Sequence, residues 1–300
     1  MNTQPVNTGS ESAGGVLSGK ANAGGSVEAG SRAVDPAVDL QNIFNNAPIN
    51  SEELDMNILI PVAEKVFSRI EAGFRRASVP GDHTFFDTDE FPWVRRIEDE
   101  WLLIRTELDR VLMDRDHLPN FQDISVDQEI LTNDDKWKSY FFYGYGFRSD
   151  VNCARCPNTA RIVSQIPGMK TAFFSILLPD KHLPAHRGPY SGVLRYHLGL
   201  RIPEPGDGCR LRVDKDIRHW EEGSSLIFDD TYDHEAWNDT SHVRVVLFVD
   251  FVRPMRFPMN FLNRAILYVI KFTPFVTDAR RRELDWEKRY AMSRTQANEY

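Results

Sequence analysis

Two histidines near the ends of strand-like segments have the clearest chemical potential. His186 opens the stretch HRGPYSGVLRYHLGL, and His234 follows the apolar segment SSLIFDD. Two neutral imidazoles that project from neighbouring strand ends of a β-barrel can bind Fe(II), Zn or Cu. A carboxylate two residues after the first histidine would complete a two-histidine, one-carboxylate iron site, but Gly188 occupies that position. The alternative is that each histidine ends a loop through backbone hydrogen bonds, and because isolated histidine pairs are common, spacing alone favours it.

Polar residues inside apolar segments indicate a second site. Arg244 lies at the start of VRVVLFVDFV, and Ser175 lies within FFSILLP. A guanidinium in a barrel wall indicates a bound carboxylate or phosphate, because its planar fork of donors matches such an anion. Ser175 could donate to the same anion. Arg195 and His197 are two residues apart and face the same side of a strand, which either lines a polar pocket or faces solvent.

The elements that must position these residues lie between 119 and 256. Short runs rich in β-branched and aromatic residues, separated by Gly, Pro, Asn and Asp, are typical of antiparallel β-barrels and jelly rolls. We therefore predict a mainly β fold with helices before and after it. The predicted strand segments cover residues 137–147, 170–179, 192–203, 209–213, 224–230 and 243–252.

The flanking regions are predicted to be of three kinds. Residues 1–48, rich in Gly, Ser, Ala and Asn at their start, are expected to form a disordered low-complexity tail. Apolar residues at helical spacing from Ser51, and again from Phe91 to Met113, predict an N-terminal helical region over 49–118. Residues 257–300 are predicted to form an amphipathic helical extension.

Charge and cysteine content exclude several classes of function. The net charge of −8 argues against a nucleic-acid partner, because phosphates require a basic face. Three cysteines are too few for a disulfide framework, and the CARC pair has no second CxxC, so reduced structural thiols are expected. A secretory signal and a long uncharged apolar stretch are both missing from the sequence, so we expect a cytoplasmic location, with a peripheral position on the inner membrane as the alternative.

From Trp137 to Pro254 the sequence resembles the aspartyl/asparaginyl β-hydroxylase family of Fe(II)- and 2-oxoglutarate-dependent dioxygenases. The shared features, in order, are a serine eleven residues before an HxG, then GVLRYHLGL, HWEEGSSLIFDD, HEAWND and Arg244. The family includes bacterial enzymes that 2-hydroxylate acyl chains of lipid A and ornithine lipids. The segments LPNFQDIS and CARCP and the helical tail look more like these bacterial members. The resemblance implies a double-stranded β-helix, which is a cupin-like jelly roll.

The resemblance also implies residue roles. His186 and His234 would be the iron ligands, with water completing the shell, because the animal aspartyl hydroxylase likewise has a glycine at the carboxylate position. Ser175 and Arg244 would hold the distal carboxylate of 2-oxoglutarate, while Arg195 and His197 would bind its other end or a substrate acid. The implied reaction needs Fe(II), 2-oxoglutarate and O2, with ascorbate as a supporting reductant, and no side chain acts as general acid or base. An aspartate in place of Gly188 is expected to be tolerated structurally.

Three functions stay open at this point. The first is hydroxylation of an Asp or Asn residue, or of a related carboxylate or amide. The second is 2-hydroxylation of a lipid acyl chain at the inner membrane surface. Lipid-A hydroxylases of the family carry an aspartate where Gly188 lies, so HRG favours the first. The third is a cupin-like binding module without turnover, and the presence of both histidines and Arg244 argues against it.

A predicted helix from Met259 to Phe272 bears on the choice of substrate. Its roughly 21 Å length is too short for a bilayer core of about 30 Å. We favour a helix that docks on the barrel or at a dimer interface, because apolar stripes are most often buried. The alternative is peripheral membrane contact through 257–282, with the helix on anionic lipid. Its polar stripe is Asn260, Asn263, Arg264 and Lys271, and the flanking basic residues are Arg253, Arg256, Arg280, Arg281 and Arg282.

Overall fold

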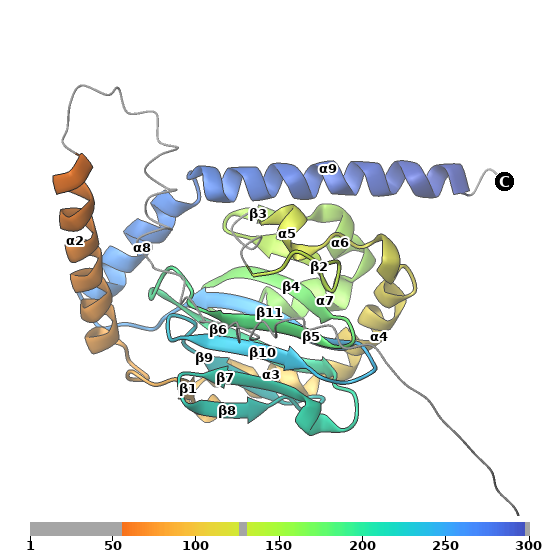
Figure 1. Cartoon of the computed structure of the whole chain (residues 1–300), viewed down its shortest axis with the longest axis horizontal. Helices are drawn as coiled ribbons and strands as arrows, with labels where there is room; N and C mark the ends of the chain where they lie inside the picture. Colours follow the sequence, from red (N-terminus) through yellow and green to blue (C-terminus); the bar gives the residue numbers. More distant parts are fainter. Residues whose placement is uncertain (1–55, 126–130, 298–300) are drawn as a thin grey trace, which may run out of the picture. The chain divides into compact units, whose positions relative to one another are not determined.

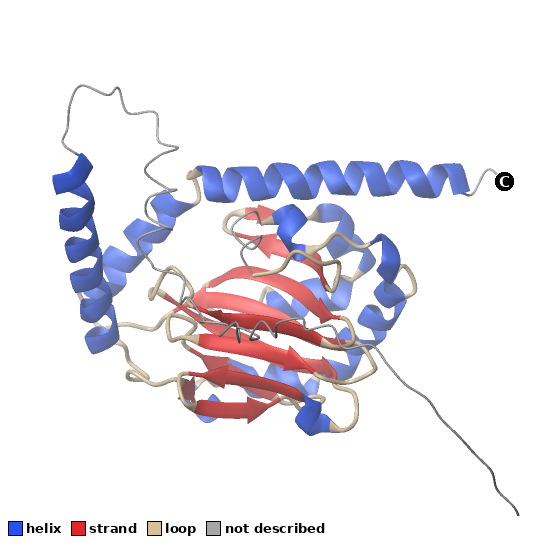
Figure 2. Ribbon diagram, in the orientation of Figure 1, coloured by secondary structure: helices blue, strands red, loops and turns tan. Residues whose placement is uncertain are grey.

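The computed structural model describes residues 56–125 and 131–297 of the chain. The tail predicted over residues 1–48 lies outside the described residues, and the predicted division into an N-terminal, a barrel and a C-terminal part stays a prediction. Within the described residues, antiparallel strands form two sheets, and helices precede and follow them in the chain (Figures 1 and 2).

The larger sheet has the strand order β1–β9–β6–β11–β4–β2–β3. Its strands span Phe85–Phe86 (β1), Trp137–Gly144 (β2), Phe147–Arg148 (β3), Met169–Leu177 (β4), Val193–Arg201 (β6), Ser225–Phe228 (β9) and Arg244–Val252 (β11). The smaller sheet has the order β5–β10–β7–β8. Its strands span Lys181–His186 (β5), Cys209–Val213 (β7), Asp216–His219 (β8) and His234–Asn238 (β10).

The two sheets pack face to face around a shared apolar core. This core joins Leu177 and Val246 of the larger sheet to Leu183, Leu211 and Ala236 of the smaller one. Because side chains alternate along a strand, the residues between these positions point to the other face of the larger sheet. That face packs against the helices in a second core, so the fold is a double-stranded β-helix with flanking helices, as predicted.

The helices span Met56–Ala77 (α2), Trp93–Asp99 (α3), Trp101–Leu112 (α4), Phe121–Ile124 (α5), Asp150–Arg155 (α6), Pro157–Val163 (α7), Met259–Ile270 (α8) and Pro274–Ala297 (α9). Helices α3–α7 and α9 contribute to the core on the outer face of the larger sheet, whereas α2 and α8 pack against each other in a separate apolar cluster. The continuous helix expected from Phe91 to Met113 is instead interrupted at Glu100, whose φ of −104° and ψ of 9° are not helical. Val94 and Ile97 of α3 and Ile104 and Leu108 of α4 nevertheless all reach the core.

Each predicted β segment contains a strand, but four strands were not predicted. These are the two-residue β1 and the longer β5, β8 and β10, and β5 and β10 carry the two histidines. Charged residues and Pro184 interrupt their apolar patterns, so the sequence signal is weak. The CARC pair lies where α6 meets α7, and Cys153 and Cys156 are buried free thiols, as expected for structural cysteines.

Candidate functional site

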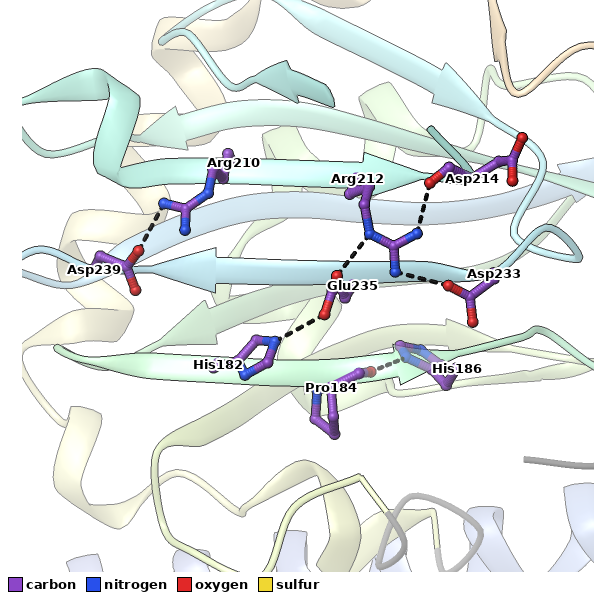
Figure 3. Close-up of polar contacts among 9 residues, drawn as sticks. All are labelled: His182, Pro184, His186, Arg210, Arg212, Asp214, Asp233, Glu235 and Asp239. Carbon is purple, nitrogen blue, oxygen red and sulfur yellow. Dashed lines mark hydrogen bonds and ion pairs between the residues drawn. The ribbon is translucent and has the colours of Figure 1, made fainter. Parts of the chain in front are cut away.

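The antiparallel pairing of β5 with β10 brings His186 and His234 together. The two residues are direct partners in the strand register, and their ring centroids lie 4.1 Å apart. Nδ1 of His186 lies 2.8 Å from the Pro184 carbonyl (Figure 3), and Nδ1 of His234 lies 3.0 Å from the Tyr232 carbonyl. A carbonyl oxygen only accepts, so each Nδ1 is the donor and each neutral ring keeps a lone pair on Nε2.

The electrostatics keep both histidines neutral. Burial, with a smaller contribution from the nearby Arg195 cation, lowers the pKa of His186 to about 4, although the hydrogen bond to the Pro184 carbonyl acts in the opposite direction. Burial also holds the pKa of His234 well below its ordinary value. His186 and Arg195 lower this pKa as well, by smaller amounts. Neutral imidazoles whose second nitrogen is bound to a carbonyl are the form in which histidine binds a metal. The pair therefore fits Fe(II), although among the described residues no third His, Cys, Asp or Glu completes a metal-binding group.

Gly188 lies against the carboxylate of Asp230, which no local sequence pattern indicates. A side chain at this position would collide with the carboxylate of Asp230, whose main-chain oxygen also accepts the Gly188 N–H at 2.7 Å. The expectation that an aspartate is tolerated at residue 188 is therefore wrong, because Asp230 already fills that space. Both carboxylates would also be buried together, which adds like-charge repulsion.

Arg195 holds Asp230 in place. Its Nη2 lies 2.7 Å from Oδ2 of Asp230, its Nε lies 3.0 Å from Oδ1 of Asp250, and its guanidinium lies over the ring of Phe248 at 4.3 Å. Burial raises the pKa of Asp230 to about 7, and the Arg195 cation opposes this rise. Arg195 is thus occupied by two carboxylates, and a direct contact with a ligand stays a prediction. An acidic Asp250 within the apolar run VRVVLFVDFV was the sequence signal for such a partner.

Arg244 is a buried cation without a carboxylate. It is 2% exposed, it lies over the ring of Trp220 at 4.4 Å, and its Nε and Nη1 have no hydrogen-bond partner within the described part of the chain. Burial lowers its pKa to about 10, so it stays protonated at neutral pH. An unpaired buried charge costs several kcal/mol, roughly, which an anion from outside would offset.

His197 and Ser175 lie on the same inner face of the larger sheet as Arg244. In the sheet register, His197 is opposite Phe248 and Ser175 is opposite Val246, which places both on strands that flank β11. Both ring nitrogens of His197 are buried without a partner among the described residues. The Ser175 hydroxyl accepts from Nε1 of Trp137 at 3.1 Å, which leaves its own proton available to an anion. These residues and Arg244 together give the inner face of the larger sheet a group of polar side chains that can bind an anion.

Ion pairs on the outer face of the smaller sheet hold the strand that carries His234 (Figure 3). Arg212 of β7 contacts Glu235 at 2.6 Å and Asp233 at 2.7 Å, the two residues on either side of His234. Glu235 also contacts His182 of β5 at 3.1 Å, so the pairs link three neighbouring strands. Each pair near the surface contributes only about 0–1 kcal/mol, but together they fix the strand ends that bear both histidines.

The chain matches one family model and several known proteins. A family model described as aspartyl/asparaginyl beta-hydroxylase matches residues 98–254. The chain is 50% identical over 210 residues to an ornithine lipid ester-linked acyl 2-hydroxylase of Rhizobium tropici, which covers 70% of this chain and 75% of that protein. It is 34% identical over 175 residues to the Homo sapiens aspartyl/asparaginyl beta-hydroxylase, which covers 56% of this chain and 22% of that protein. A solved Pseudomonas putida prolyl-4-hydroxylase has 16% identity and a TM-score of 0.33 over 54% of this chain and 99% of its own, too distant to support an inference.

Proposed function

Because the chain belongs to the aspartyl/asparaginyl β-hydroxylase family and is a hydroxylase by that membership, we propose that it uses Fe(II) and 2-oxoglutarate to hydroxylate a lipid acyl chain. Different observations support the use of Fe(II) with 2-oxoglutarate and the choice of a lipid substrate, and separate experiments test them.

The observation that carries the cofactor part is the orphaned guanidinium of Arg244. No carboxylate of the described chain neutralises this fully buried cation, and two of its nitrogens lack acceptors. A dicarboxylate cosubstrate supplies the missing charge with one end. Ser175 and Arg244 would hold that distal carboxylate, and His197 would contact the other end or an acid of the substrate. Arg195 is a second candidate for this contact, although Asp230 and Asp250 occupy it here.

His186 and His234 would hold Fe(II) through their Nε2 atoms. When bound, Fe(II) with 2-oxoglutarate and O2 supplies the oxidising power that converts a C–H bond into C–OH. The chain's own contribution is to fix the two tautomers, to neutralise the anion and to exclude water. The ring centroid of Phe228 lies 5.9 Å from that of His234, and the ring centroid of Phe248 lies 5.0 Å from that of His197. The proposed iron ligand and the proposed anion-binding residue therefore both have apolar neighbours. An apolar enclosure strengthens the charged contacts within it.

The relative from Rhizobium tropici supports the lipid substrate, since its similarity extends over 70% of this chain at 50% identity. Hydroxylation of an Asp or Asn residue is the second candidate, supported by the 34% identity to the human protein. Gly188 does not decide between the two, because Asp230 takes the space that a carboxylate at residue 188 would need. A binding module without turnover is disfavoured by the matched pair of neutral histidines beside an unpaired buried cation.

The substitution Arg244→Lys tests the cosubstrate part. Lysine keeps the charge and loses the two-pronged geometry, which removes about 1.5–3 kcal/mol of charged hydrogen bonding. We expect the KM for 2-oxoglutarate to rise roughly 10- to 100-fold, while Fe(II) affinity measured by titration stays unchanged. Arg210→Lys, at an exposed pair with Asp239, is the matched control. An unchanged KM in Arg244→Lys would remove the proposed anion site.

Mass spectrometry of reaction products tests the substrate part. The full-length protein is incubated with Fe(II), 2-oxoglutarate and either ornithine-lipid vesicles or an Asp- and Asn-containing peptide. We expect the lipid acyl chain, and not the peptide, to gain the mass of one oxygen atom. Gain on the peptide alone would move the assignment to Asp or Asn hydroxylation.

A further inference from the structure

Helix α8 is attached to the body of the protein by a polar residue. Asn263 is 0% exposed; its Oδ1 accepts from the Tyr190 hydroxyl at 2.6 Å, and its Nδ2 donates to the Gly192 carbonyl at 2.7 Å. Leu267, one turn further on, is buried on the same side. The amphipathic pattern of this segment favoured a helix that buries its apolar side on the barrel. The structure instead turns part of the polar stripe inward, which leaves much of the apolar side outward.

The outward side of α8 is aromatic and aliphatic. Phe261, Tyr268 and Phe272 follow one another at helical spacing and are 73%, 61% and 63% exposed. Phe257, just before the helix, is 84% exposed, and Val269 extends the same surface. Large exposed apolar patches of this kind mark interaction sites rather than ordinary surface. We call these five residues the α8 apolar face.

Three basic residues lie along one edge of the α8 apolar face. Arg264 and Lys271 lie close enough to Lys170 of β4 that their charges, after burial, lower the pKa of Lys170. The Lys271 ammonium lies 3.9 Å from the ring centroid of Tyr268 and 4.6 Å from that of Phe272. In the described part of the chain these three cations form no ion pair, whereas Arg281 and Lys288 of α9 pair with aspartates. An unneutralised basic edge in a chain of net charge −8 selects an anionic partner.

We infer that the α8 apolar face docks into the surface of an anionic lipid bilayer, with Lys170, Arg264 and Lys271 at the headgroup phosphates. An interfacial helix combines an inserted aromatic face with flanking Lys and Arg, and α8 has both. Among the described residues, no helix is both long and apolar enough to cross a membrane. The inference rests on the proposed function only for the idea that the bound membrane also contains the substrate.

The docking surface is connected to the candidate site through one loop. Tyr190 and Gly192, which bind Asn263, lie between His186 at the end of β5 and the start of β6. The same loop contains Gly188, against which Asp230 packs. The helix proposed to bind the membrane is therefore held on its inward side by the segment that follows one proposed iron ligand. An apolar hollow of about 340 Å³ between α2 and α8, lined by Val66, Ile70, Gly73, Met259 and Leu262 with Arg69, continues this surface.

The basic edge in this arrangement differs from the one expected from sequence. Arg253 is fully buried in an ion pair with Asp229, so it cannot reach a lipid headgroup. Arg281 pairs with Asp278 at 3.0 Å, and Arg282 lies against the main chain at Asp123. The test is therefore made at Arg264 and Lys271 rather than at the run 280–282.

Co-sedimentation with vesicles tests the inference on the full-length protein. Vesicles of phosphatidylcholine alone are compared with vesicles that also contain phosphatidylglycerol, at low and high salt. We expect binding to the anionic vesicles that weakens with salt. Arg264→Gln with Lys271→Gln should weaken it roughly 25-fold, because each basic residue near the surface contributes about 1 kcal/mol, or about fivefold. Phe261→Gln with Phe272→Gln should weaken binding at either salt concentration.

Matched controls use exposed residues elsewhere on the fold. Arg95→Gln with Arg96→Gln on α3 removes the same charge, and Leu102→Gln with Met113→Gln at α4 removes exposed apolar surface. Neither control should change vesicle binding. Because all the substituted side chains are solvent-exposed or half-buried and lie outside the site, thermal unfolding and substrate-free consumption of 2-oxoglutarate should stay near the parent values.

Several results would overturn the inference. These are a parent protein that binds neither vesicle, α8 variants that bind like the controls, and a parent that self-associates through the α8 apolar face without binding lipid. A parent protein that consumes 2-oxoglutarate but does not bind vesicles would refute docking and leave the cofactor chemistry intact. Vesicle binding without any 2-oxoglutarate consumption would support docking and refute the proposed chemistry.

Discussion

At the scale of single residues, the candidate site consists of polar groups that differ in whether the chain itself satisfies them. Arg195 is paired with Asp230 and Asp250, whereas Arg244 and His197 have buried nitrogens without partners among the described residues. A folded chain tolerates such unpaired groups where a ligand completes them. Arg195 is therefore a residue that other side chains of the protein already bind, whereas Arg244 and His197 are the residues proposed to bind a ligand.

The histidine pair can be tested by removal of either ring. His186→Ala or His234→Ala should abolish Fe(II)-dependent 2-oxoglutarate consumption, because no third side chain of the described residues joins the pair. His219→Ala, on the exposed strand β8, is the control and should keep full activity. Activity at the parent level in either site variant would exclude the proposed metal site.

The packing of Gly188 against Asp230 predicts a conditional effect of a side chain at residue 188. Gly188→Asp should destabilise the protein by about 1–3 kcal/mol through overpacking, and further through repulsion from Asp230. Adding Asp230→Ala should restore much of this loss, since Arg195 keeps Asp250 as partner. Chemical denaturation of the parent, of Gly188→Asp, of Asp230→Ala and of the double variant gives the coupling between the two changes.

The control for this pair is Gly206→Asp. Nothing lies within 4 Å of a side chain added at Gly206, so its effect should be small. Additive effects of Gly188→Asp and Asp230→Ala would mean that the two positions do not compete for one space.

At the scale of elements, the C-terminal helices dock through buried polar residues rather than through apolar stripes alone. In α8 the buried polar residue is Asn263, which donates to the Gly192 carbonyl. In α9 it is Glu283, whose carboxylate accepts a hydrogen bond from Asn152 of α6 at 3.3 Å. Burial, with a smaller contribution from the neighbouring Glu287, raises the pKa of Glu283 to about 8. Trp286, one turn on, joins the main core.

The buried Glu283 predicts a pH dependence of stability. Its folded-state pKa lies above its ordinary value of 4.5, so between about pH 4.5 and 8 the folded state holds a proton that the unfolded state has lost. Stability should therefore fall as pH rises through this window, by up to about 5 kcal/mol above pH 8. Glu283→Gln should remove most of this fall and be more stable than the parent at pH 8.5. Denaturation curves at pH 5.5 and 8.5 measure it, and a parallel fall in Glu283→Gln would contradict the assignment.

At the scale of the whole molecule, the residues of the candidate site come from the facing sides of both sheets. The smaller sheet contributes His186 and His234, and the larger sheet contributes Ser175, His197 and Arg244. A ligand that binds residues of both sheets stabilises the folded state as a unit, since the unfolded chain holds none of them together.

This arrangement predicts that 2-oxoglutarate raises the melting temperature. At a concentration of about 100 times Kd the ligand contributes about 2.7 kcal/mol, which corresponds to roughly 5–10 °C for a domain of this size. Arg244→Leu should abolish the shift, because its unpaired cation is the group that the ligand neutralises. Differential scanning calorimetry with and without ligand measures it. An equal shift in Arg244→Leu would place the binding elsewhere.

The sequence alone determined the chemistry that the site contains. A guanidinium at the start of an apolar run and two histidines beside strand segments are visible without a structure, because residue types and their side of a strand follow from period-two alternation. The antiparallel β architecture follows from the same alternation and from the turn residues between the runs.

Tertiary structure decided which of these residues meet and which way each face turns. His186 lies opposite His234 because of the β5–β10 register, which depends on contacts far apart in the sequence. Asp230 fills the space beside Gly188 from a different loop, and no local pattern specifies that approach. Helical spacing defined the stripes of α8, but only the hydrogen bonds of Asn263 to Tyr190 and Gly192 turned part of its polar stripe inward. Periodicity gives the relative angle of side chains on one helix, and the orientation of the helix depends on its partners.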